Sequence, residues 1–230
     1  GVLEVETPLL RECGVTDPQL ENIRVEKPFK RNEWLYLQTS PEYAMKQLIA
    51  LGSGSIYQLC KAFRKDPIGK YHNFEFTMLE WYRVGFSLEQ LIQDVAAVVT
   101  SVGMAEEKEV VTYQQLFQQL LNIDPLTAPL ETIVALAKQK IDIDACNEDK
   151  DFWLDLLLTH CIEPELGRGK LTFVIDYPES QAALAKIKIN SADCKVAERF
   201  ELYIEGVEIA NGYSELTDPG EYLQRFIDDN

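Results

Sequence analysis

The sequence has 230 residues, enough for one substantial domain with its own core. Hydrophobic residues make up 46% of it and charged residues 26%, as in ordinary soluble globular proteins, and no apolar run approaches the roughly 18 residues of a membrane-spanning helix. The formal net charge of −16 argues against extended nucleic-acid binding and favours a basic protein partner or a small molecule held with magnesium.

The five cysteines are widely spaced, and the only histidines are His72 and His160. This pattern predicts reduced thiols rather than a zinc site or a disulfide framework. The first residues carry two acids and no basic segment, which is unlike a secretory signal. We therefore expect a cytoplasmic protein.

Residues 2–7 alternate apolar and acidic side chains and stop at Pro8, as a half-buried strand would. Residues 34–38 are typical of a second strand. A helix should follow, because Ser40 can cap it and Pro41 suits its first position. We expect that helix to end near Gly52.

A β-hairpin is predicted next, with strands at 55–64 and 75–84 and a loop over 65–73 that contains Pro and Gly. The block from about 88 to 161 has helical periodicity, interrupted by proline and glycine, and should form several helices. Strand patterns return at 171–177, 196–203 and 207–213, and residues 221–227 favour a helix. The order of strands, helices and strands predicts one α+β domain over residues 1–230 with a mostly antiparallel sheet flanked by helices.

Two strand regions carry more polar side chains than packing requires. In the first, alternation places Phe76, Met78, Glu80 and Tyr82 on one face of the strand at 75–84. An aromatic ring beside a carboxylate and a phenol suits a site that stacks a base and binds an amine. On alternation alone, a surface hairpin with charged tips is the favoured alternative.

In the second region, a hairpin turning at residues 205–206 brings Glu201 and Glu208 near one another. Two close carboxylates repel, but they can hold Mg²⁺ together with substrate phosphates. Two solvated glutamates on an exposed hairpin are the alternative, and spacing alone does not choose between these interpretations.

Together and in this order, the segments resemble the class II aminoacyl-tRNA synthetases of the lysine branch. Residues 2–8 resemble the end of motif 1, residues 63–76 resemble motif 2, and residues 198–215 resemble the segment characteristic of the lysine branch. The similarity covers most of the chain. It implies the class II catalytic fold and formation of an aminoacyl adenylate from ATP.

Within that branch the sequence is most similar to the short paralogues of lysyl-tRNA synthetase that modify elongation factor P. Five segments carry this similarity: 56–60, 69–73, 80–83, 178–182 and 196–200. The resemblance implies no anticodon-binding domain and a homodimer that uses ATP and Mg²⁺. It also implies activation of (R)-β-lysine or lysine, with a lysine side chain of elongation factor P as the acceptor and no role for tRNA.

The same resemblance implies a role for individual residues. Arg64 is the expected catalytic residue, which would bind the α-phosphate of ATP while charge develops there. The metal ligands would be Glu201 and Glu208. The remaining ATP-binding positions would be Asp66, His72, Asn73, Phe76 (under adenine), Glu208 and Ile209. The amino-acid-binding positions would be Ser40, Pro41, Glu42, Tyr82, Asn211 and Glu215.

Some features depart from the family pattern. Asp66 stands where motif 2 usually has glutamate, and Phe74 stands where proline is usual. The glycine-rich motif 3 and the helix of motif 1 are absent, so we expect a catalytic core truncated at both ends, with weak ATP binding and little turnover. A lysyl-tRNA synthetase core that charges tRNA and a non-catalytic binding or regulatory module are the alternatives.

Overall fold

The computed structural model describes residues 1–15 and 20–228, and it divides into two compact units. Unit 1 comprises Gly1–Phe86 and the stretch from Leu223 on, and unit 2 comprises Ser87–Tyr222. Helix α6 (Pro219–Asp228) includes the point of division, and it confirms the helix predicted at 221–227. The single domain over 1–230 stays a prediction.

The main sheet of unit 1 has the order β1-β5-β6, and its strands are β1 (Leu3–Glu4), β5 (Ile56–Phe63) and β6 (Glu75–Tyr82). The predicted hairpin is confirmed, because β5 and β6 pair antiparallel along their whole lengths. The strand predicted at 2–7 is shorter than expected. Only two residues form the parallel ladder with β5, although the N–H of Val5 still donates to the carbonyl of Tyr57 at 2.9 Å.

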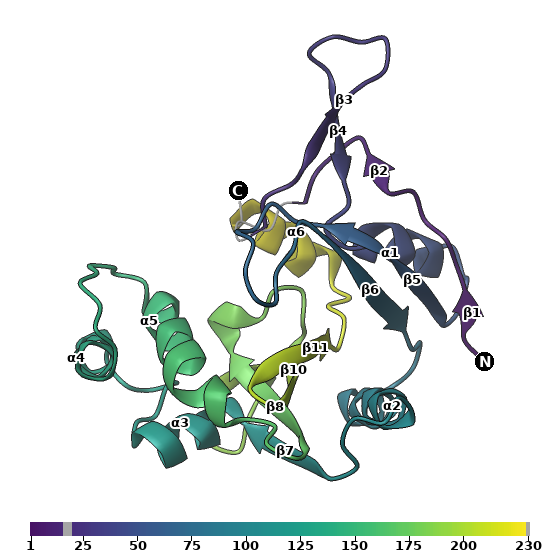
Figure 1. Ribbon diagram of the computed structural model, residues 1–230. Helices are drawn as coiled ribbons and strands as arrows, with labels where there is room; N and C mark the ends of the chain where they lie inside the picture. Colours follow the sequence, from purple (N-terminus) through teal and green to yellow (C-terminus); the bar gives the residue numbers. More distant parts are fainter. Residues whose placement is uncertain (16–19, 229–230) are drawn as a thin grey trace. The chain divides into compact units, whose positions relative to one another are not determined.

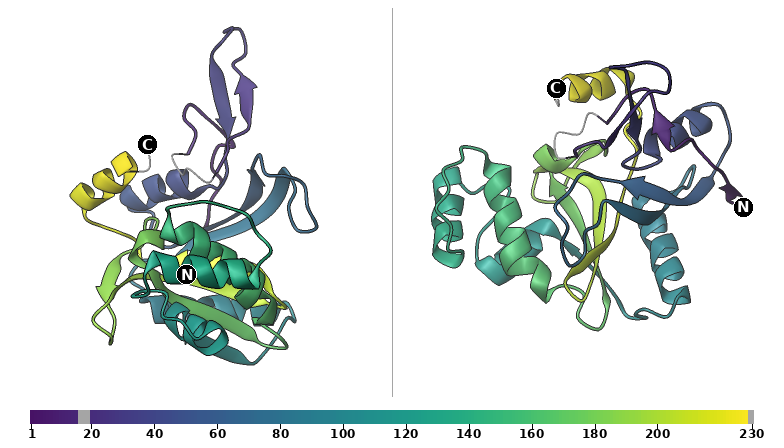
Figure 2. Two further views of the ribbon diagram at one scale, coloured as in Figure 1. Left: turned by 90° about the vertical axis from the view of Figure 1, so that its left-hand side faces the viewer. Right: turned by 45° about the horizontal axis from the view of Figure 1, so that its top comes forward.

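A second small sheet of unit 1 has the order β2-β4-β3, and its strands are β2 (Leu10–Arg11), β3 (Arg24–Glu26) and β4 (Trp34–Leu37). β4 confirms the strand predicted at 34–38, whereas β2 and β3 are too short to show a sequence pattern. β3 and β4 form a hairpin that extends away from β5 and β6 (Figures 1 and 2).

Helix α1 (Glu42–Ala50) confirms the predicted helix, but the predicted cap at Ser40 is wrong. Pro41 occupies the cap position with φ −78°, and no side chain caps the helix. Ser40 therefore lies one residue too early, and its hydroxyl accepts only a 3.4 Å hydrogen bond from the N–H of Glu42. The helix still ends as predicted, with Gly52 at φ 92° just beyond it.

Unit 2 is built on a five-stranded sheet whose main order is β11-β10-β8-β7, with β9 also paired to β10. Only the β7–β8 pair in it is parallel, so the predicted α+β class with mostly antiparallel strands is confirmed. Its strands are β7 (Lys108–Thr112), β8 (Leu171–Pro178), β9 (Ile187–Ile189), β10 (Lys195–Ile204) and β11 (Val207–Tyr213).

Helices cover both faces of this sheet: α2 lies on one face and the group α3–α5 on the other (Figure 1; Figure 2, right). The main core lies between α3–α5 and the sheet and includes Phe117, Trp153, Leu154 and Val174. No helix in the described part of the chain is long and apolar enough to cross a membrane. The helices are α2 (Leu88–Ser101), α3 (Tyr113–Leu121), α4 (Leu130–Lys140) and α5 (Lys150–Leu157), followed by a π-helical turn (Leu158–Ile162) and short 3₁₀ turns (Glu163–Glu165 and Glu179–Gln181).

Candidate active site

In unit 1, the β5–β6 hairpin positions an arginine against an aromatic ring. Arg64 follows Phe63, the last residue of β5, whose partner on β6 is Glu75. Its guanidinium lies 5.2 Å from the centre of the Phe76 ring, and its Nε is buried with no hydrogen-bond partner among the described residues. A buried donor without an acceptor carries a desolvation cost, so it is suited to receive an anion.

The loop after Arg64 borders an open surface hollow of about 360 Å³, lined by residues 68–73 and by Phe76. A turn from the N–H of Gly69 to the carbonyl of His72 shapes it. The structure therefore brings the predicted His72, Asn73 and Phe76 to one hollow at the surface. The half-buried Asp66 lies in the same loop but does not line the hollow.

Farther along β6, the predicted Tyr82 is held by Glu80, the carboxylate that alternation placed on the same face. The hydroxyl of Tyr82 donates to Glu80 Oε1 at 2.9 Å, and both side chains are half-buried. The shared face with Phe76 and Tyr82 was therefore predicted, although the family resemblance assigned no separate role to Glu80. The pair offers a carboxylate beside a phenol, which can bind an ammonium group.

The three predicted residues around the start of α1 are found in different environments. Pro41 is buried, whereas Ser40 and Glu42 are half-buried. The Glu42 carboxylate accepts a hydrogen bond from Lys46 Nζ at 2.7 Å, so part of its charge is already compensated within the helix. The loop before α1 is tied to β5, because Gln38 Nε2 donates to the carbonyl of Lys61 at 2.8 Å.

In unit 2, the β10–β11 hairpin carries the second predicted set. Glu201 pairs with Asn211, and Tyr203 pairs with Glu208; a register shift leaves Ile209 as an extra residue between them. Because alternation is kept on both sides of the shift, Glu201, Glu208 and Asn211 share one face. Glu208, Ile209 and Asn211 are exposed, whereas Glu201 is only 8% exposed.

Two further features lie at and beyond the end of this hairpin. Gly212 lies against Phe200, and a Cβ at Gly212 would approach that ring to 2.5 Å, so a glycine is required after Asn211. Beyond β11, the half-buried Glu215 forms an isolated antiparallel bridge with Ala185.

The carboxylate of Glu201 is surrounded by donors. Arg199 donates to its Oε1, and the hydroxyls of Tyr177 and Tyr203 donate to its Oε2 at 2.5 and 2.6 Å. Burial, and then the charge of Glu201, raise the pKa of both tyrosines well above the ordinary value. Both hydroxyls are therefore protonated donors at neutral pH.

The two predicted metal ligands, Glu201 and Glu208, differ in how they could bind a divalent cation. An ionised carboxylate has about four lone-pair sites, so the three donors leave Glu201 about one for an ion. Glu208 is exposed, with its carboxylate on the same face. Among the described residues no group of three or more His, Cys, Asp or Glu side chains could hold a metal alone, and the remaining ligands would have to come from substrate and water.

The residues predicted to form one site thus lie on two hairpins, one in each unit. Unit 1 contains Ser40, Pro41, Glu42, Arg64, Asp66, His72, Asn73, Phe76 and Tyr82; unit 2 contains Glu201, Glu208, Ile209, Asn211 and Glu215. Each set is consistent with its predicted chemistry. The assembly of the two sets into one site stays a prediction.

Comparison with known proteins assigns one family to the whole chain, which includes both hairpins. The family model of tRNA synthetases class II (D, K and N) matches residues 1–230. A protein of Histophilus somni (strain 2336), named elongation factor P–(R)-β-lysine ligase, is 47% identical over 233 residues, which cover all of this chain and 72% of that protein. Proteins of the same name from Mannheimia succiniciproducens and Salmonella arizonae are each 46% identical with the same coverage.

Proposed function

Because this chain belongs to the class II tRNA synthetases (D, K and N), we propose that it activates (R)-β-lysine with ATP and ligates it to a lysine side chain of elongation factor P. The observation that carries the proposal is the similarity to ligases of that name along the whole chain, at 46–47% identity. The proposal includes ATP and Mg²⁺ as requirements, a homodimer, a cytoplasmic location and no role for tRNA.

The first step is attack of the amino acid carboxylate on the α-phosphorus of ATP, with pyrophosphate as the leaving group. Negative charge develops on the α-phosphate oxygens in the transition state, and Arg64 stabilises it through its guanidinium donors. The buried Arg64 Nε without a partner among the described residues supports this role. Phe76 provides the ring face for adenine, and His72 and Asn73 line the hollow beside it.

The amino groups of the substrate are bound by carboxylates. The Glu80–Tyr82 pair binds the distal ammonium, because a half-buried carboxylate favours a cation and disfavours a neutral isostere. Glu42 binds the amine nearer the carboxylate and would exchange part of its contact with Lys46 for it. Asn211 and Glu215 act at the carboxylate and ammonium ends of the same substrate.

Glu201 and Glu208 would hold Mg²⁺. When bound there, the ion neutralises charge on the outer phosphates of ATP. The second step is attack of a lysine amine of elongation factor P on the activated carbonyl, which forms an amide and releases AMP.

The test is ATP–pyrophosphate exchange by the purified protein with (R)-β-lysine or with α-lysine, followed by mass analysis of elongation factor P. We expect weak but measurable exchange that depends on a lysine isomer, with (R)-β-lysine preferred, and a gain of one lysyl residue on the acceptor. Silence with both isomers would overturn the proposal. Aminoacylation of tRNA without modification of the protein would replace it by a lysyl-tRNA synthetase activity.

A further inference from the structure

Three side chains donate hydrogen bonds to the Glu201 carboxylate, which is more than a metal ligand at the protein surface requires. They come from two adjacent strands of unit 2, Tyr177 from β8 and Arg199 and Tyr203 from β10. Each of the three side chains directs a polar hydrogen at one carboxylate. Glu163 Oε1 lies farther from the Tyr203 hydroxyl, at 3.3 Å, so the single hydroxyl proton goes to Glu201.

The donors are themselves immobilised. Tyr177 is 1% exposed and Tyr203 is fully buried, and both belong to the main core of unit 2. The guanidinium of Arg199 lies 4.5 Å from the centre of the Tyr177 ring, and its Nη1 donates to the carbonyl of Gln181 at 2.7 Å. Packing therefore sets the position of each donor, and the donors set the position of Glu201.

Burying this arrangement costs desolvation free energy that stability alone does not justify. Well-packed apolar side chains stabilise a core as well as a buried ion pair does, because burying charges costs desolvation energy. A network of this kind does hold a carboxylate in one rotamer with a defined free lone pair. Partners that orient a ligand in this way have large effects on metal affinity.

We propose that Arg199, Tyr177 and Tyr203 are positioning residues, which fix Glu201 so that it presents one carboxylate lone pair to the Mg²⁺ bound with ATP. The two carboxylates then differ in role: Glu201 is a rigid ligand, and the exposed Glu208 is the adjustable one. This inference rests on the proposed function, since it takes Glu201 as a magnesium ligand, and it adds the residues that prepare that ligand.

The test removes one hydroxyl at a time and measures metal binding directly. In the whole chain, Tyr177→Phe and Tyr203→Phe each delete a donor to Glu201 and keep the ring. The matched control is Tyr113→Phe, because Tyr113 is fully buried in the same core and makes no hydrogen bond to Glu201. Binding of Mn²⁺ in the presence of ATP is followed by electron paramagnetic resonance, and urea unfolding reports whether each variant is folded.

We expect Mn²⁺ to bind roughly tenfold more weakly to each of the two donor variants and within about twofold of the parent for Tyr113→Phe. Arg199→Lys keeps the charge and loses the planar fork, so it should fall between them. Folded Tyr177→Phe and Tyr203→Phe variants that bind Mn²⁺ with parental affinity would overturn the positioning role. If Mn²⁺ binding to the parent chain does not depend on ATP and is unchanged in Glu208→Gln, the metal site in the proposed function is wrong.

Discussion

The two units differ sharply in charge, although each contains predicted site residues. Residues 1–86 carry 11 Lys and Arg against 11 Asp and Glu, whereas Ser87–Tyr222 carries 10 against 25. Nearly all of the net charge of −16 therefore lies in unit 2. The predicted phosphate-binding residues lie in the neutral unit, so the acidic balance of the chain does not oppose nucleotide binding there.

The units also differ in their cores. Among the described residues of unit 1, the buried apolar side chains are Pro41, Ala44, Met45, Ile56 and Ala62. The main core cluster lies wholly in unit 2. Unit 1 presents its site residues from a hairpin with few buried contacts, and unit 2 presents them from a packed sheet. We infer that unit 1 is the more adaptable part and that unit 2 supplies most of the stability.

The largest expected effect is a loss of activity in unit 1 with little change in the free energy of unfolding. Arg64→Ala should lower lysine-dependent ATP–pyrophosphate exchange about 10³-fold, because the developing charge on the α-phosphate loses its donor. The free energy of unfolding, measured in urea, should change by less than about 1 kcal/mol, because Arg64 is only half-buried. Lys61→Ala removes an exposed cation from the same hairpin and should leave exchange unchanged. Equal losses in both variants would show that only the charge of the hairpin matters.

The next effect compares two leucines. Leu154 is 1% exposed in the core of unit 2, and Leu59 is 63% exposed on β5 of unit 1. Leu154→Ala should cost about 3 kcal/mol of unfolding free energy, since it leaves a cavity, and Leu59→Ala should cost less than about 1 kcal/mol. Both values come from urea denaturation. A comparable cost at Leu59 would contradict the difference between the units and indicate that this surface is covered in solution.

The smallest effect tests the acidic character of unit 2. Burial, then the charges of Asp151 and Glu201, raise the pKa of Asp155 to about 6. The folded state therefore favours the protonated form, and this contribution to stability is full below pH about 4 and is lost as the pH rises through 6. Asp155→Asn, whose amide oxygen can still accept from Gln181, should stabilise the protein at pH 7 by about 1 kcal/mol, a value reduced for solvent screening.

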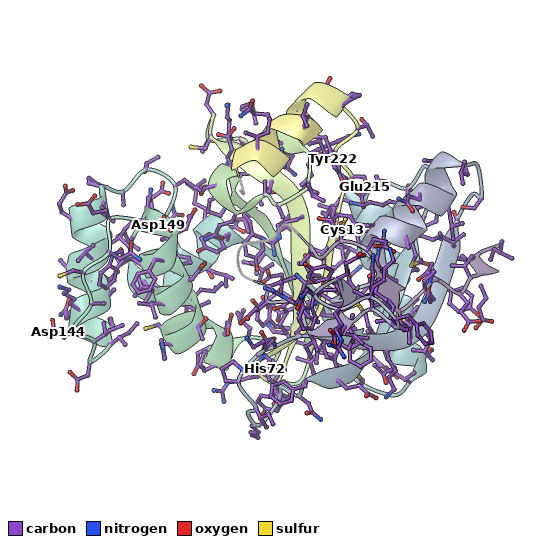
Figure 3. All side chains as sticks on the ribbon, turned by 90° about the horizontal axis from the view of Figure 1, so that it is seen from above. Cys13, His72, Asp144, Asp149, Glu215 and Tyr222 are labelled. Atoms are coloured by element: carbon purple, nitrogen blue, oxygen red, sulfur yellow. The ribbon has the colours of Figure 1, made fainter. Side chains whose placement is uncertain are left out.

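The same substitution should flatten the dependence of unfolding free energy on pH between 4 and 6. Asp144→Asn is the control, because Asp144 is exposed at the outer side of the helical block (Figure 3) and should change stability by less than about 0.5 kcal/mol. A similar gain from both variants would mean that net charge, rather than the local surroundings of the Asp155 carboxyl, limits the stability of unit 2.

Much of the fold was predictable because its strands and helices carry local periodic signals. β6 alternates exposed and half-buried residues along most of its length, and α2 repeats apolar residues at helical spacing. β7 was missed within the predicted helical block, because its Lys-Glu-Val-Val-Thr segment is stabilised by parallel pairing with a distant strand. The cap at Ser40 was misassigned by one residue, because Pro41 takes that position.

For the candidate site, the sequence by itself determined the identity of the reacting groups. The run Glu-Arg-Phe-Glu and the second glutamate that follows it lie within one short stretch of sequence. A family resemblance rests on such short stretches. Tertiary structure decided what each group contacts. Glu80 and Tyr82 lie two residues apart on β6, so alternation along one strand already places them together. Only folding, however, brings Tyr177 on β8 to Glu201 on β10, 24 residues away. That contact depends on side chains that meet across strands, which no single segment encodes.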